Sequence, residues 1–98
     1  MFLADNLKFL RKRRKKTQDD VAFALQLKRS TLNGYENGVG EPKLEKLMAL
    51  ADYYQIRLDD LVRTDLRKLP ESKLRELAVM EPVQLLVAGL LVRTLPKA

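Results

Sequence analysis

The sequence predicts an all-α fold in which five short helices are followed by a C-terminal helix and a short apolar tail. Apolar residues recur at the three- and four-residue spacing of a helix face. The alternation typical of strands is rare before residue 83, and capping residues, Gly38 and Pro42 mark the helix ends. A chain of 98 residues, 46% of them hydrophobic, is long enough to build one modest core.

The first two helices should be short and capped by side chains. We expect the first over residues 6–15, with Asp5 as its N-cap. The second should begin at Thr17, whose hydroxyl accepts a backbone hydrogen bond while Asp20 completes a capping box. It should end near Gln26, where a turn leads to the next helix.

Glycine and proline delimit the third and fourth helices. The third should run over residues 29–36, and Gly38 is suited to the left-handed conformation that closes a helix. Pro42 should lie in the first turn of the fourth helix, where its missing N–H costs nothing. The fourth helix should bury a stripe of residues at helical spacing: Leu44, Leu47, Met48, Ala51 and Tyr54.

The pattern changes after a short fifth helix over residues 59–62. A new amphipathic helix is expected over residues 71–80, with Pro82 stopping it. The remaining apolar segment, residues 83–95, fits both a strand and a helical turn, because short apolar runs cannot be assigned by periodicity. We therefore expect two parts: a helical domain over residues 1–65 and an arm over residues 66–98.

The positive charge of the chain is concentrated near its start. The net charge is +6, and residues 1–30 carry nine lysines and arginines against three aspartates, whereas residues 31–98 are balanced. Such a concentration is typical of a surface that neutralises DNA phosphates. The run from Arg11 to Lys16 also fits a solvated helix end or a site for acidic partners. This run alone therefore does not identify the binding partner.

The composition argues against enzymes, metal sites and membrane proteins. The chain has no cysteine and no histidine, which excludes disulfides, thiolate ligands and the commonest proton shuttle. Its only serines are Ser30 and Ser72, and it has no glycine-rich phosphate loop, so we expect no catalysis, no cofactor and no metal. The longest apolar stretch, Leu85 to Val92, is far shorter than the roughly 20 residues of a membrane span. No secretory signal is recognisable, so we expect a cytoplasmic protein.

Two short helices joined by residues 25–28, the second polar and basic on its outer side, match what a DNA-reading helix-turn-helix requires. Any helical hairpin shares this spacing, so the spacing alone does not distinguish a DNA-binding motif from an ordinary hairpin. The combined motifs, however, resemble the Xre/Cro type of phage and bacterial repressors over about residues 3–64. The motifs lie at residues 7–11, 17–22, 29–38, 41–42 and 58–61.

This resemblance implies a sequence-specific regulator of transcription that binds double-stranded DNA, acting as a repressor and as a homodimer on a palindromic operator. It implies that Gln18 lies at the DNA backbone and that Arg29 contacts guanine through two hydrogen bonds. For Gln18 the alternative is a plain surface glutamine. The residues expected at the DNA are Thr17, Gln18, Lys28, Arg29, Ser30, Thr31, Asn33, Gly34 and Asn37.

Gly34 stands where relatives often carry a longer side chain that faces DNA, and it is expected to allow a close backbone approach. Asn37 is a candidate phosphate contact, with a simple helix terminus as the alternative. Arg11 and Glu36 match a pair of residues that forms an ion pair in the family, and we expect this pair to serve architecture. The sequence departs from many relatives at Gln26, which replaces a turn glycine and must adopt a left-handed conformation.

Other functions remain open at this point. The same fold serves in antitoxins, which repress their own operon while a second surface neutralises a toxin, and the segment from Pro70 onward is a candidate for that surface. The same segment is also a candidate dimerisation arm. A third possibility is that the chain is the DNA-binding portion of a longer protein.

Overall fold

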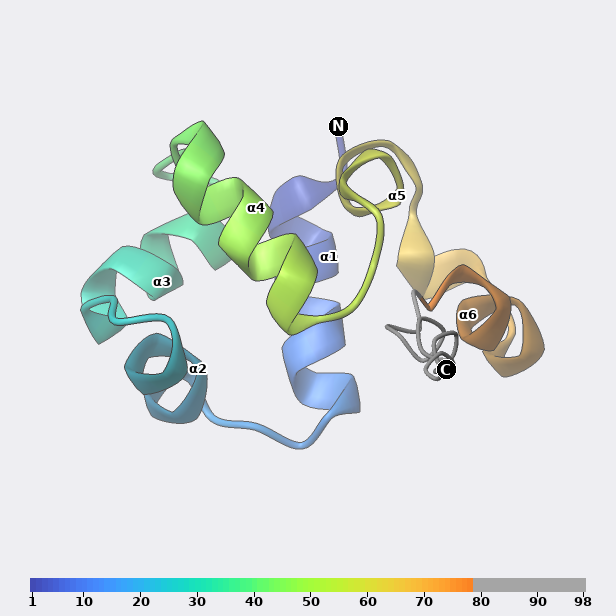
Figure 1. Ribbon diagram of the computed structural model, residues 1–98, viewed down its shortest axis with the longest axis horizontal. Coiled ribbons are helices and arrows are strands. Elements are labelled where there is room, and N and C mark those ends of the chain that lie inside the picture. Colours follow the sequence, from blue (N-terminus) through green and yellow to red (C-terminus); the bar gives the residue numbers. More distant parts are fainter. Residues whose placement is uncertain (79–98) are drawn as a thin grey trace, which may run out of the picture.

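The computed structural model describes residues 1–78, and residues 79–98 lie outside the described part. Within residues 1–78 the chain is entirely helical apart from turns, loops and one isolated bridge, so the all-α prediction is confirmed (Figure 1). Five α-helices fall in the first 65 residues, as expected. The elements are α1 (Leu3–Arg13), α2 (Gln18–Ala24), α3 (Arg29–Glu36), α4 (Leu44–Tyr53), α5 (Leu58–Arg63), the 3₁₀ helix η1 (Leu66–Lys68) and α6 (Glu71–Leu77).

The start of α1 differs from the prediction. The helix begins at Leu3 with Phe2 at the N-cap, so Asp5 lies in the first turn and the expected Asp5 cap is wrong. A tertiary contact explains the early start, because the Phe2 N–H donates to the carbonyl of Val62 at 2.9 Å and holds the chain against α5. The Asp5 carboxylate still favours the positive end of the helix dipole.

Several helices close on a residue with a left-handed backbone. Gly38 has a φ of 74° and Gln26 a φ of 56°, so both expectations are confirmed. Lys15 and Gln55 adopt the same conformation, with φ of 58° and 53°. Because Lys15 is left-handed, α1 ends at Arg13 and not at Lys15 as predicted. A side chain in this region costs about 1 kcal/mol, which the closing turn hydrogen bonds offset.

The fourth helix begins later than predicted. Lys43 is its N-cap, with an extended backbone, and its carbonyl accepts from the Leu47 N–H at 2.8 Å, so Pro42 precedes the helix. The buried face of α4 is centred on Leu50 and Ala51. Of the predicted stripe, Ala51 and Tyr54 are buried and Leu47 packs against the core, whereas Leu44 and Met48 are exposed.

The end of α6 also comes earlier than expected. The helix stops at Leu77 because Ala78 is extended and forms an antiparallel bridge with Ile56. The rest of the predicted helix, residues 79–80, and the apolar segment at residues 83–95 lie outside the described residues. The 3₁₀ helix η1 was not predicted, and the Asp65 side chain caps it.

The core surrounds α1, which contacts α3 and α5 (Figure 1). Leu7 and Leu10 of α1 belong to one buried cluster to which every other helix of residues 1–78 contributes. Because α3 packs on α1 and α2 packs on α3, the outer faces of α2 and α3 are fixed. The buried apolar residues are Leu7, Leu10, Val21, Ala22, Leu32, Leu50, Ala51, Tyr54, Ile56, Leu61, Leu66 and Leu74.

A buried asparagine joins α1 to the end of α5. The Asn6 side chain is fully buried and its Nδ2 donates to the carbonyls of Leu61, at 2.7 Å, and Thr64, at 2.6 Å. Its Oδ1 accepts from the Leu66 N–H at 3.1 Å. One side chain thus satisfies three backbone groups at a helix end, and it fixes the path by which the chain leaves the first five helices.

Candidate nucleic-acid interface

The second helix begins with a reciprocal capping box. The Thr17 hydroxyl oxygen accepts from the Asp20 N–H at 3.0 Å, and the Asp20 carboxylate accepts from the Thr17 N–H at 2.9 Å. This capping prediction is confirmed. The Thr17 N–H also holds the pKa of the Asp20 carboxyl below its usual value. The box fixes the entry into α2 and therefore the place of the next residue, Gln18.

The third helix has one buried and one exposed side. Leu32 and Glu36 are buried, whereas the N-cap residue Lys28 and the first two helical residues, Arg29 and Ser30, face solvent. The Thr31 side chain is half-buried. Arg29 lies 3.8 Å from the Asp19 carboxylate, but both side chains are well exposed. Such a pair is weak, so the Arg29 guanidinium stays available to another acceptor.

A buried ion pair links α3 to α1. The Arg11 Nε donates to Glu36 Oε2 at 2.8 Å, and a second guanidinium nitrogen donates to Oε1 at 3.1 Å. The Glu36 side chain is fully buried and that of Arg11 is 12% exposed. The hydrogen bond to Glu36 raises the pKa of Arg11. Arg11 also donates to the Lys16 carbonyl at 3.0 Å, which ties the loop before α2 to the same pair.

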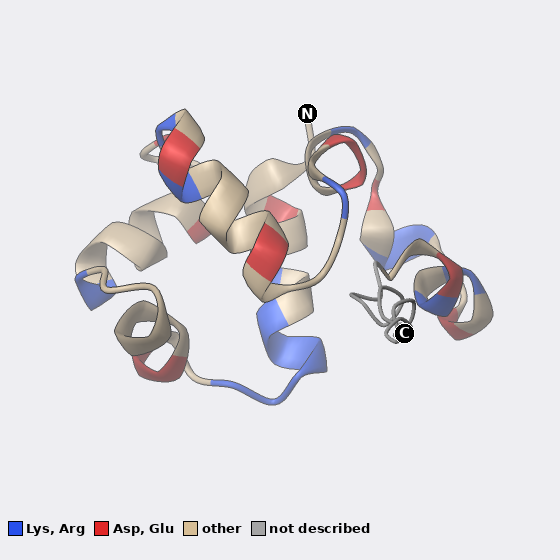
Figure 2. Cartoon of the chain, viewed as in Figure 1, with Lys and Arg blue, Asp and Glu red and all other residues tan. Residues whose placement is uncertain are grey.

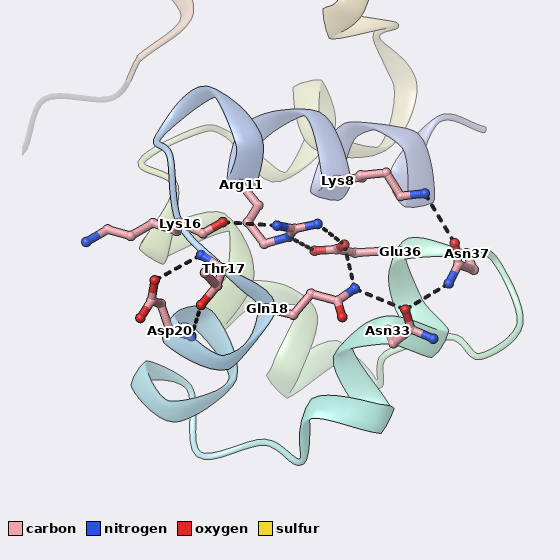
Figure 3. Close-up of polar contacts among 9 residues, drawn as sticks. All are labelled: Lys8, Arg11, Lys16, Thr17, Gln18, Asp20, Asn33, Glu36 and Asn37. Atoms are coloured by element: carbon pink, nitrogen blue, oxygen red, sulfur yellow. Dashed lines mark hydrogen bonds and ion pairs between the residues drawn. The ribbon is translucent and has the colours of Figure 1, made fainter.

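Three of the residues expected at the DNA, Gln18, Asn33 and Asn37, meet in one hydrogen-bond network (Figure 3). The Gln18 amide nitrogen donates to Glu36 Oε1 at 3.1 Å and to Asn33 Oδ1 at 3.0 Å. The Asn37 amide nitrogen also donates to Asn33 Oδ1, at 3.0 Å, while Asn37 Oδ1 accepts from Lys8 Nζ at 3.3 Å. Sequence reasoning did not single out Lys8. It lies three residues before Arg11 on α1, the spacing of a shared helix face, and that signal was available.

The basic run divides into paired and exposed charges. Arg13 forms an ion pair with Glu71, which joins α1 to α6. Arg14 donates to the Tyr53 carbonyl at 2.9 Å, and its guanidinium lies 5.5 Å from the ring centre of Tyr54. Both arginines therefore have partners elsewhere in residues 1–78. The lysines of the run are exposed and lie in the last turn of α1 and the loop before α2, where Figure 2 shows positive charge gathered: Lys12, Lys15 and Lys16.

Gly34 is not required by the packing of the chain. A Cβ at this position would have its nearest neighbour, the backbone nitrogen of Gly40, at 3.9 Å, which is an ordinary contact. The Gly34 carbonyl accepts from the N–H groups of Val39, at 2.9 Å, and Gly40, at 3.2 Å. The loop after α3 is thus folded back against the helix.

Residues 1–78 hold no group of three or more acidic side chains that could bind a metal ion. None of the helices in that stretch is long and apolar enough to cross a membrane.

Comparison with known proteins connects this geometry to a family. A helix-turn-helix family model, HTH_3, matches residues 7–61, more than half of the chain. The chain belongs to the Xre/Cro-like helix-turn-helix family of DNA-binding transcriptional regulators. In this family α2 and α3 are the helix-turn-helix, and the members are regulators that are typically not enzymes.

One curated relative is the HTH-type transcriptional regulator AnsR of Bacillus subtilis (strain 168). It is 35% identical to this helix-turn-helix protein over 74 residues, which is 76% of the present chain and 64% of AnsR. The matched region thus spans just under two thirds of the length of that relative. No solved structure matches the chain significantly.

Proposed function

We propose that this protein is a cytoplasmic transcriptional repressor, without catalytic activity, that binds a specific double-stranded DNA operator with α3 in the major groove. The observation that carries the proposal is the exposed polar surface at the start of α3, where Arg29 has only a weak, exposed partner, braced from behind by the buried Arg11–Glu36 pair. Specific readout needs side chains held in place over a rigid helix, and this arrangement provides both.

The contacts that we propose follow from what each side chain is free to do. Arg29 has no strong partner, so it is suited to a bidentate contact with guanine. Lys28, Ser30 and Thr31 border the same helix start and are proposed to contact phosphates or base edges. The Thr17 hydroxyl accepts within the capping box, which leaves its proton for a phosphate oxygen.

Gln18 and Asn37 are proposed mainly as supports of the reading helix. Both amide hydrogens of Gln18 are directed at Asn33 and Glu36, so the side chain braces α3 while α2 lies along the DNA backbone. Asn37 retains one amide hydrogen for a phosphate. For Gly34 we propose close approach of the α3 backbone to DNA, since the chain itself leaves room there for a side chain.

We propose that residues 1–65 form the DNA-binding domain and that residues 66–98 contribute to a homodimer. The sequence supports this, because the apolar run from Leu85 to Val92 needs cover. A symmetric dimer binds two half-sites whose centres are about 10 base pairs apart. No observation on the described residues specifically favours a toxin partner.

Selection from a library of random duplexes with the full chain tests this proposal. The sequences recovered should share an inverted repeat with half-sites about one helical turn apart. Placed over a promoter, that site should lower expression of a reporter when the protein is present. Recovery of no common motif would contradict specific recognition, and recovery of a single asymmetric site would contradict the dimer.

Sedimentation velocity separates the role of the arm from DNA recognition. The full chain should sediment as a dimer, and a variant with Leu85→Asp and Leu91→Asp should shift toward monomer and bind the inverted repeat less tightly. A chain that sediments as a monomer at the concentrations that saturate the repeat would refute self-association through the arm.

A further inference from the structure

At one end of the hydrogen-bond network, Lys8 fixes the orientation of the Asn37 side-chain amide. Lys8 carries an ammonium group, which can only donate, so the Asn37 oxygen must face it. The Asn37 amide nitrogen then points the other way and donates to Asn33. Reversal of the Asn37 amide would place its NH2 group against the ammonium and lose both hydrogen bonds.

At the other end of the network, the Glu36 carboxylate fixes the orientation of the Gln18 amide, because a carboxylate can only accept. The buried Glu36 carboxylate accepts both guanidinium hydrogen bonds of Arg11, so it meets Gln18 as an acceptor. The Gln18 nitrogen must therefore face Glu36, and its second hydrogen goes to Asn33. Two donors converge on Asn33 from opposite sides (Figure 3).

The Asn33 side chain has only one way to satisfy both neighbours. Its Oδ1 accepts from Gln18 and from Asn37, each at 3.0 Å, which uses both lone pairs of a carboxamide oxygen. The residue is exposed and lies on α3 one turn after Arg29 and Ser30. The Asn33 NH2 group is thus the part of the amide left for a ligand.

We infer that Asn33 is a donor-only contact to DNA, held in that orientation by Lys8 at one end of the network and Glu36 at the other. This inference rests on the proposed DNA-binding function. The partner must be an acceptor: a phosphate oxygen, N7 of adenine or guanine, O6 of guanine, or O4 of thymine. The familiar two-bond contact of asparagine with adenine is excluded, because it needs the same oxygen to accept from adenine N6.

A near-isosteric substitution tests the direction of the contact. Asn33→Asp keeps an oxygen for Gln18 and Asn37 and replaces only the outward NH2 group with a second oxygen. Asn33→Ala removes the side-chain amide altogether. Anisotropy with the selected duplex should give an order of affinity in which the wild type binds best, Asn33→Ala is several-fold weaker, and Asn33→Asp is at least tenfold weaker.

The control for added negative charge is Gln55→Glu, which makes the same change from amide to carboxylate at an exposed position in the turn after α4. It should change the affinity less than twofold. Thermal denaturation of each variant shows that the fold is retained. If Asn33→Asp binds as well as the wild type, or better than Asn33→Ala, the outward group acts as an acceptor and the inference is wrong.

Two further experiments identify the acceptor. If it is a base, selection with Asn33→Asp should change the preferred base pair at one position in each half-site. If it is a phosphate, the base preference stays, and neutralising one phosphate as a methylphosphonate should weaken the wild type but not Asn33→Asp. A wild type that binds no duplex refutes the proposed function itself, whereas binding that is insensitive to both Asn33 changes refutes only the donor contact.

Discussion

Replacing Arg11 with methionine should lower the free energy of unfolding by about 3–5 kcal/mol, because it leaves the buried Glu36 carboxylate without its counter-charge. The Glu36 side chain has no exposed surface, and its remaining partner, Gln18, supplies one neutral hydrogen bond. Methionine preserves much of the volume and the apolar stem of arginine, so the loss reports the charge and its hydrogen bonds and not a cavity.

Urea denaturation followed by circular dichroism measures this change. A matched control is Arg63→Met, which removes an exposed partner of Asp59 at the i, i+4 spacing and should cost no more than about 0.5 kcal/mol. The double variant Arg11→Met with Glu36→Leu should recover much of the stability, since no buried charge is left unpaired. A loss below about 1 kcal/mol for Arg11→Met alone would show that the pair does not support the fold.

Asn6→Ala should be the second most damaging change and should lower the free energy of unfolding by about 3 kcal/mol. Three backbone groups lose their partner at once: the carbonyls of Leu61 and Thr64 and the N–H of Leu66. Each buried group left unsatisfied costs about 1–3 kcal/mol, and water reaching the partly buried Thr64 carbonyl reduces the total.

The same chemical change on the surface provides the control for Asn6. Asn37→Ala, at an exposed position, should cost less than about 1 kcal/mol. Amide hydrogen exchange adds a local readout, because the Leu66 N–H should exchange faster in Asn6→Ala by more than the global loss of stability explains. Equal stability of the two variants would mean that the Asn6 bonds contribute little.

Local rules of sequence predicted much of the fold. The capping box of Thr17 and Asp20 and the left-handed Gln26 and Gly38 involve only neighbouring residues, and all are confirmed. The Asp5 cap failed because the start of α1 is set by a bond from Phe2 to a residue 60 positions later, which no local pattern reports.

Buried polar contacts are the main feature of the fold that the sequence did not predict. Asn6 lies four residues before Leu10 on the apolar face of α1, and a polar residue in that stripe was a signal for a structural hydrogen bond. Its partners cannot be named from sequence, since they are backbone groups 55 to 60 residues away.

At the candidate interface, the resemblance supplied the residues, but their contacts needed the structure. A run of like charges does not reveal which members are paired, and only the tertiary fold shows that Arg13 and Arg14 hold α6 and the end of α4. Likewise, the direction of the Asn33 amide depends on residues from three helices, one of which is Lys8 on α1.

The most direct test of the central claim is fluorescence anisotropy of the full chain with labelled duplexes over a series of salt concentrations. The selected duplex and a random duplex are compared, beside a variant with Arg29→Ala and Ser30→Ala. We expect the logarithm of the binding constant to fall linearly with the logarithm of the salt concentration. The variant should lose about 10- to 100-fold in affinity for the selected duplex and much less for the random one. Failure of the wild type to bind any duplex at low salt would contradict the account.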